Sequence, residues 1–312
     1  MTMTRASYIV AAVAAGALLV LLPLLGSGYI VYLANLMLVY IVLALGLNIL
    51  IGETGQFGLA HVAFYGIGIY TTAILTGRFD VPFLIAAAAG VLLAGAIGLL
   101  LGYVSFRMRD IYLALSTFAF GEAMQWVYRS WDAVTNGPNG MRIKPAELFG
   151  FRIATDHDAY PFVLATTIII IAATVWLRRS RLGRAFRAVR ESEPAALAMG
   201  VDVRRAKVIA FALSAAYAGA AGGMFASFSS FIHPDSLGFT ETILVVTMIV
   251  VGGLGSIPGA IVGALVLGAV QELLRQAPSY QEILYGVILI LFMMYLPKGL
   301  AGAVGNLARR AG

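Results

Sequence analysis

Long runs of apolar residues without charge constrain this chain more than any other feature. The runs at 9–25 and 160–177 approach the roughly 20 residues that an α-helix needs to cross a bilayer core about 30 Å thick. Strands of a membrane barrel would alternate polar and apolar side chains, and these runs do not. Hydrophobic residues make up 61% of the 312 residues and charged residues 12%, and the mean hydropathy is +0.91. A soluble domain of this length could not bury so much apolar surface, so the sequence predicts an all-α helical bundle in lipid.

Polar breaks divide the apolar sequence into about ten membrane segments, within a single transmembrane domain over residues 1–312. The predicted segments are 8–26, 29–51, 56–76, 82–104, 111–131, 160–178, 207–231, 240–254, 257–275 and 281–297. Glycine clusters near 52–58 and 252–259 interrupt the apolar pattern in both halves of the chain. We therefore expect broken or re-entrant helices at 56–76 and 240–254.

Basic residues in the short loops predict the orientation of the bundle. Residues 178–207, here called the coupling loop, hold nine Lys and Arg residues against three acidic residues, which places this loop in the cytoplasm. Arg5, the turn at Arg107 and the basic tail at 298–310 are then cytoplasmic as well, so both termini are expected there. The 132–159 loop has mixed charge and is expected to face the periplasm.

The coupling loop carries the signals of two short helices joined near Ser192. Ser192 or Glu193 can cap the second helix, Pro194 suits its first turn, and Gly200 provides a left-handed stop.

Each of these two predicted helices has a small apolar edge. Phe186 with Val189 forms the first edge and Leu197 with its neighbouring alanines the second, and we expect both to dock into a partner. The charged residues that can pair around this dock are Arg184, Arg187, Arg190 and Glu191. The alternative is an ordinary positively charged loop, but anchoring alone does not require a capped, Ala-rich helix.

Polar side chains at membrane depth need a partner or a solvated route, since an unpaired one costs a few kcal/mol. Asn48, Gln56 and His61 lie among the glycines of the first break, where bent backbone can line a translocation pathway. Glu122 lies in the middle of 111–131, where it can contact an amino group in transit. Hydrogen bonding between helices is the alternative for each of these four residues. The other polar residues of this class are Glu53, Gln125 and Glu241.

Several function classes are disfavoured by missing residues. The chain has no Cys, which excludes disulfides and thiolate metal sites on it. The Gly-rich run at 252–256 lacks the Lys of a phosphate-binding loop. The three His residues are too scattered for a zinc motif, and no Ser has an evident His and acid partner. The sequence therefore predicts neither catalysis nor a cofactor or metal on this chain.

Five tracts, in order along most of the chain, resemble the LivM-like permeases of branched-chain amino acid ABC transporters. The tracts are LGLNILIGETGQFGLAH (45–61), RMRDIYLALST (107–117), TNGPNG (135–140), GRAFRAVRESEPAALAMG (183–200), and PDS with VGGLGS (234–236 and 251–256). Five ordered matches are far more specific than any single one.

The resemblance implies that 183–200 is the segment that fits a groove on a cytoplasmic ATPase. Importer permeases carry Glu-Ala-Ala, three further residues and Gly at this place. Here the two alanines and Gly200 match, whereas Pro194 takes the Glu position and Glu193 comes one residue early. The expected coupling residues are Gly183, Arg184, Arg187, Arg190, Glu191, Glu193, Ala195, Ala196 and Gly200.

The resemblance also implies a permease of the bacterial inner membrane that imports leucine, isoleucine, valine or related small amino acids or amides. Its implied partners are a second, homologous permease, two cytoplasmic ATPase subunits that bind ATP and Mg²⁺, and a periplasmic substrate-binding protein. Similar permeases carry urea, amides or aromatic acids, and the sequence does not choose among these substrates. The alternative is a carrier or channel driven by an ion gradient, which predicts paired intramembrane acids or sodium-coordinating breaks and no docking loop.

Overall fold

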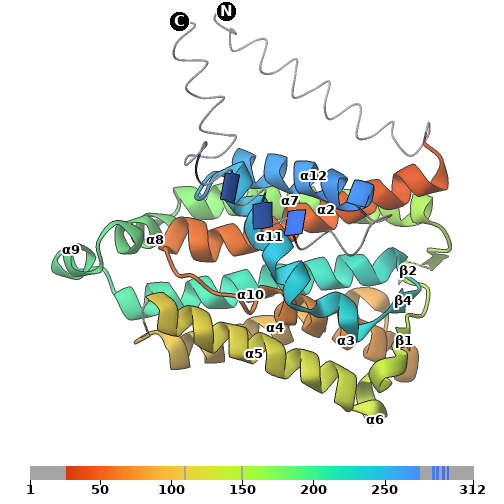
Figure 1. The fold of residues 1–312 in the computed structure, drawn as a ribbon. Coiled ribbons are helices and arrows are strands. Elements are labelled where there is room, and N and C mark those ends of the chain that lie inside the picture. Colours follow the sequence, from red (N-terminus) through yellow and green to blue (C-terminus); the bar gives the residue numbers. More distant parts are fainter. Residues whose placement is uncertain are drawn as a thin grey trace, which may run out of the picture.

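The computed structural model describes residues 26–108, 110–148 and 150–274, together with residues 283–284, 286–287, 290–291 and 294. Within residues 26–274 it contains eleven α-helices and four strands of two residues each (Figure 1). The predicted all-α class is confirmed for the part of the chain that is described.

Seven long helices and one shorter apolar helix form the body of the molecule. They are α2 (Gly28–Leu47), α3 (His61–Arg78), α4 (Phe83–Ser105), α5 (Asp110–Ser130), α7 (Asp156–Arg179), α10 (Val203–Phe228), α11 (Phe239–Gly252) and α12 (Ile257–Leu274). The helix α2 continues directly into a π-helical turn, η1 (Asn48–Glu53), and irregular backbone then leads to α3. Residues 253–256 form the corresponding interruption between α11 and α12.

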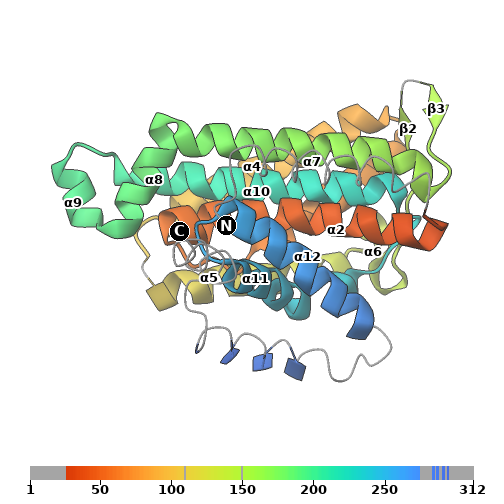
Figure 2. The ribbon, with the colours of Figure 1, turned by 90° about the horizontal axis from the view of Figure 1, so that it is seen from above.

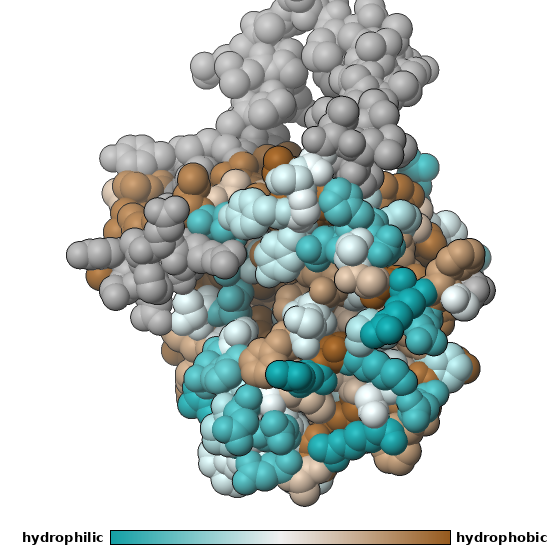
Figure 3. Space-filling model, turned by 90° about the vertical axis from the view of Figure 1, so that its right-hand side faces the viewer, coloured by the Kyte–Doolittle hydropathy of each residue, from teal (hydrophilic) through white to brown (hydrophobic). Residues whose placement is uncertain are grey.

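Polar segments lie at opposite ends of this body (Figures 1 and 2). One end carries α8 (Arg181–Glu191) and α9 (Glu193–Ala198). The other, here called the strand end, carries α6 (Asp132–Thr135), η2 (Gly137–Asn139), β1 (Met141–Arg142), β2 (Glu147–Leu148), β3 (Phe151–Arg152), β4 (Phe231–Ile232) and η3 (Pro234–Leu237). There β1 pairs antiparallel with β4, and β2 with β3. Figure 3 looks onto this end, where hydrophilic side chains gather.

Small residues allow α4 and α10 to pack closely. On α4 the buried positions recur every four residues, which places them on one helix face. They include Ala86, Gly90, Ala94, Gly98 and Gly102. A Cβ at Gly98 would collide with Ala215 of α10. Small residues in this spacing let helix backbones approach where lipid supplies no hydrophobic drive for association.

Large apolar side chains cover the opposite face of α4. Leu92, Leu93, Leu99 and Leu100 are all exposed, as expected for a face that meets lipid rather than water.

Eight of the ten predicted membrane segments coincide with helices to within a few residues. Of the other two, 8–26 lies outside the described residues except for residue 26, and 281–297 is described at only seven positions. Five helical stretches are long and apolar enough to cross a membrane: Gly28–Glu53, Phe83–Ser105, Asp156–Arg179, Val203–Phe228 and Ile257–Leu274. The helix α11 is shorter, at 14 residues, because Gly253 adopts a positive φ of 116° and ends it.

Candidate functional site

The coupling loop forms the two short helices predicted from its sequence. The Ser180 side chain accepts a hydrogen bond from the Gly183 amide (3.3 Å) at the start of α8, and the Ser192 side chain accepts one from the Ala195 amide (3.4 Å) at the start of α9. Gly200 has a φ of +80°, the left-handed conformation that follows a helix end. Each of the two helices of the loop therefore begins at its own capping serine.

The apolar edge of α8 packs inside the chain. Phe186 and Val189 are 1% and 3% exposed. They belong to a buried cluster with Leu50 of η1 and with Ala210 and Phe211 of α10. The expectation that Phe186 and Val189 dock into a partner is therefore wrong, because the membrane helices of the same chain already cover them.

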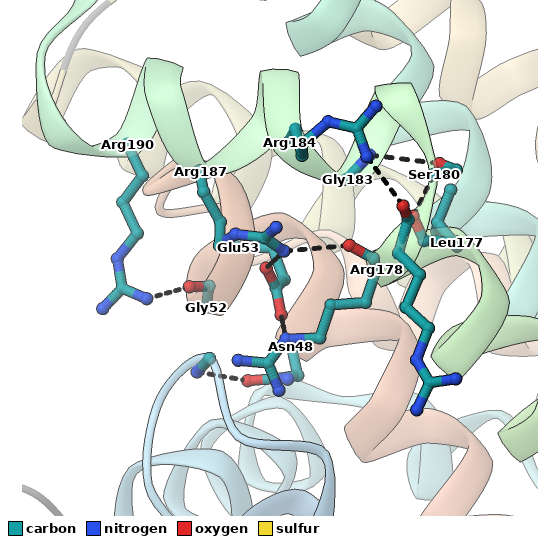
Figure 4. A network of polar contacts seen from close by, with 12 residues as sticks. Asn48, Gly52, Glu53, Leu177, Arg178, Ser180, Gly183, Arg184, Arg187 and Arg190 are labelled. Carbon is teal, nitrogen blue, oxygen red and sulfur yellow. Dashed lines mark hydrogen bonds and ion pairs between the residues drawn. The ribbon is translucent and has the colours of Figure 1, made fainter.

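A buried carboxylate joins the coupling loop to the π-helical turn η1. Glu53 is 7% exposed, and its Oε1 lies 3.2 Å from Nε of Arg178 while its Oε2 lies 3.5 Å from Nη1 of Arg187. The same Nη1 of Arg187 donates a hydrogen bond to the carbonyl oxygen of Arg178 (3.1 Å). Figure 4 shows Glu53 between the two guanidinium groups. Opposite charges attract more strongly where bulk water is partly excluded, so the ion pairs of Glu53 hold η1 against α8.

Arg190 reaches both glycine-rich breaks. Its Nη1 donates a hydrogen bond to the carbonyl oxygen of Gly52 in η1 (Figure 4). A Cβ built on Gly255 would meet the same Nη1 at 2.5 Å. The Asn48 side-chain oxygen accepts a hydrogen bond from the Gly255 amide (2.8 Å). The two breaks, about 200 residues apart in the sequence, thus contact each other, and the Arg190 side chain of α8 contacts both. We call this contact the break junction (Asn48, Gly52, Gly255 and Arg190).

The other predicted coupling residues on α8 also face the chain itself or the solvent. Arg184 donates a hydrogen bond to the carbonyl oxygen of Arg179 (2.9 Å). Gly183 is buried, and a Cβ there would collide with the backbone of Leu177 and Arg178. Close packing of α8 against the end of α7 thus explains why residue 183 is a glycine. Glu191, at the end of α8, is exposed to solvent.

The helix α9 behaves differently. Glu193 forms an ion pair with Lys207 at the start of α10, and Ala196 is 3% exposed. The side chains of Leu197 and Met199 are 60% and 84% exposed, and Ala195 and Gly200 are exposed as well. The most exposed large apolar side chains of the loop are therefore Leu197 in α9 and Met199 directly after it.

The predicted pathway residues do not come together in one site. Asn48 belongs to the break junction. Gln56 donates a hydrogen bond to the carbonyl oxygen of Lys207 (3.3 Å). The two ring nitrogens of His61 lie 3.0 Å from the carbonyl oxygen of Leu43 and 3.1 Å from the Ser214 hydroxyl.

Glu122 lies apart from these residues on α5, where it is exposed. The buried residues Asn48, Gln56 and His61 each form a hydrogen bond to another segment of the chain, which was the alternative to a role in the pathway.

A cavity of about 250 Å³ lies toward the strand end, among α2, α3, α10, α11 and α12. Its polar lining includes Glu241 of α11 and Gln271 and Glu272 of α12. The Gln271 side-chain amide donates a hydrogen bond to the Glu241 carboxylate (3.2 Å). The sequence marks Glu241 as a polar residue at membrane depth without indicating its role, and it does not single out Gln271 or Glu272.

The sequence pattern did not indicate the role of Gly255 at the break junction, or that of Glu53 and Arg178 in the ion pairs beside it. An acid directly after the Gly52 break, and a second glycine break late in the chain, were the available signals. Neither says which distant segments meet.

A family model for the permease component of branched-chain amino acid transport systems matches residues 29–293. The LivM permease protein of Escherichia coli K12, a high-affinity branched-chain amino acid transport protein by name, is 34% identical, with 89% of this chain and 71% of that protein covered. The LivH permease protein of Salmonella typhimurium is 28% identical over 84% of this chain and 91% of its own length. The L-arabinose ABC transporter permease AraH of Azospirillum brasilense is 28% identical over 78% of this chain and 72% of that protein. No solved structure matches the chain.

The family model covers most of the chain, including both breaks and the coupling loop. The family is one of permease subunits rather than enzymes, in agreement with the absence of a catalytic motif in the sequence. The chain belongs to the multi-pass membrane permeases of bacterial branched-chain amino acid ABC transport systems.

Proposed function

We propose that this chain is the permease subunit of an ATP-driven importer that carries leucine, isoleucine or valine into the cytoplasm. The observation that carries the proposal is the construction of the coupling loop. One of its helices is fixed to the break junction, and the other presents exposed apolar side chains to the outside. This arrangement suits an element that receives movement from another protein and passes it to the membrane helices.

The proposed topology has ten membrane segments, with both termini and the coupling loop in the cytoplasm and the 132–159 loop in the periplasm. The positions of the coupling loop and the strand end at opposite ends of the helices support this orientation (Figure 1). The excess of basic residues at 178–207 selects the cytoplasmic side.

The proposed assembly contains a second, homologous permease, two cytoplasmic ATPase subunits that bind ATP and Mg²⁺, and a periplasmic substrate-binding protein. Similarity to both LivM and LivH supports a pair of related permeases, since both names belong to branched-chain amino acid transport. We propose that α9 contacts the ATPase through Leu197, Met199 and the exposed Ala195.

The proposed pathway runs past Gln56 and His61 toward the break junction, with Glu122 on the exposed side of α5. Its wall then includes Asn48 and the backbone of both breaks, where bent helices expose carbonyls and amides.

The proposal is tested by co-expressing the chain with the ATPase subunits and second permease encoded beside it. We expect the tagged chain to recover the ATPase subunits, and vesicles that contain the complex and the binding protein to accumulate leucine only with ATP. Deletion of residues 184–199 should abolish both. The importer proposal fails if wild-type protein recovers no ATPase, or if uptake survives the deletion and follows an ion gradient instead.

A further inference from the structure

The cavity toward the strand end has the chemistry of a ligand site. Its volume, about 250 Å³, is many times the about 10–15 Å³ that one ordered water needs. Its wall combines the Glu241 carboxylate with the aromatic side chains of Tyr32, Tyr65 and Phe225. The Gln271 side-chain oxygen is buried and has no hydrogen-bond partner among the described residues.

The charge of the cavity selects one kind of ligand. Its charged lining residues, within the described part of the chain, are Glu241 and Glu272, both acidic. Glu272 is already engaged by the Tyr29 hydroxyl, whereas within the described residues Glu241 is held by the Gln271 amide alone. A carboxylate in such a partly enclosed place is stabilised by a cation.

The residue types that line the cavity favour an ammonium group over a metal ion. Hard cations such as Ca²⁺ take six to eight oxygen ligands, and no cluster of three His or acidic residues that could hold a metal occurs in the described residues. Aromatic faces attract ammonium groups. Leu43, Val62 and Val245 supply an aliphatic part of the same wall.

From these contacts we infer that the cavity is a binding site for the ammonium group and aliphatic side chain of a small amino acid or amine, with Glu241 as the partner of the ammonium group. The inference rests on the proposed function and deepens it by naming the recognised group. The charged side chains of the described lining are acidic, so the ammonium group is the part of an amino acid that this charge attracts.

The position of Glu241 also links this site to the coupling loop. Glu241 lies in the first turn of α11, and the same helix ends at Gly252, three residues before Gly255 of the break junction. A helix of 14 residues spans about 21 Å. A ligand held at one end of α11 therefore contacts a helix whose other end leads, within three residues, to the Gly255 that meets Asn48 and Arg190.

The test uses the complete permease and ATPase complex in nanodiscs, without the binding protein, and measures equilibrium binding of radiolabelled leucine. Isopentylamine, which is leucine without its carboxylate, should compete for the site, and 4-methylpentanoate, which is leucine without its amine, should not. Glu241→Gln should weaken leucine binding at least tenfold. Glu147→Gln, an exposed acid-to-amide change at the strand end, should leave binding unchanged.

Competition by the acid as strong as by the amine would overturn the inference, and so would unchanged leucine binding in a folded Glu241→Gln complex. The competition needs no variant, so it decides the matter even if Glu241→Gln fails to assemble. ATP-driven uptake in vesicles is measured separately. Absent uptake with intact, amine-selective binding would reject the proposed function and keep the site, whereas normal uptake without Glu241-dependent binding would do the reverse.

Discussion

The helices α8 and α9 follow each other on one loop, yet they present opposite surfaces. The α8 helix buries Phe186 and Val189, and its Arg187 and Arg190 side chains contact the π-helical turn of the same chain. The α9 helix leaves Leu197 exposed and is held by a buried alanine and one ion pair. A loop built this way separates two tasks, because the inner helix is fixed to the membrane helices while the outer helix is left available.

The largest expected effect comes from removing apolar volume on α8 and not on α9. Phe186→Ala should destabilise the protein by about 3–5 kcal/mol, the usual cost of truncating a buried Phe. Leu197→Ala, at a site that is 60% exposed, should stay within about 0.5 kcal/mol. Thermal unfolding of both variants in the same detergent measures this difference. Equal melting temperatures would show that α8 is not packed as described.

A smaller effect is expected from the carboxylate that ties α8 to η1. Glu53→Gln should cost about 1–3 kcal/mol, between the cost of losing an exposed ion pair and that of breaking a buried one. The cost stays below that of a fully buried pair because the Arg178 and Arg187 side chains are 40% and 39% exposed and can be hydrated. Glu147→Gln provides an exposed control. A Glu53→Gln protein that melts with the wild type would remove Glu53 from the link.

The smallest effect is expected at the strand end, where Lys144 and Asp80 form an exposed ion pair at 2.6 Å. The Lys144 ammonium holds the pKa of Asp80 below its usual range. The pair therefore contributes at pH values above the ordinary pKa of Asp, and its contribution is lost as the pH falls through the lowered pKa. Solvent and salt screen such a pair, so Lys144→Ala should not change the melting temperature measurably at pH 7. A clear shift that disappears in high salt would contradict this.

The sequence predicts the helical body well and the contacts between its parts poorly. Apolar runs give helix positions because each run must satisfy its backbone hydrogen bonds within lipid. Ser192 and Pro194 predict the start of α9 and Gly200 predicts its end, because helix capping depends on residues next to each helix end. The amphipathic pattern of α8 shows that Phe186 is apolar-facing, but it cannot say whether the facing surface belongs to this chain or to a partner.

The break junction and the cavity lie beyond sequence reasoning for the same reason. The contact of Arg190 with Gly52, and that of Asn48 with Gly255, join segments separated by more than 130 residues. Glycine clusters mark both breaks, but only the packing of η1 on the loop before α12 brings them together. Glu241 was visible as a costly acid at membrane depth, whereas its neighbour Gln271 on another helix was not.

In the proposed mechanism, α8 carries movement to the break junction while α9 holds the ATPase. The most direct test measures leucine transported per ATP hydrolysed in vesicles that contain the complete importer, for the wild type, Arg190→Ala and Leu197→Asp. We expect the Arg190→Ala complex to keep its ATPase subunits and their ATP hydrolysis but to transport several-fold less leucine per ATP. We expect the Leu197→Asp chain to have unchanged stability and to recover fewer ATPase subunits. An unchanged ratio of leucine to ATP in Arg190→Ala would contradict the claim.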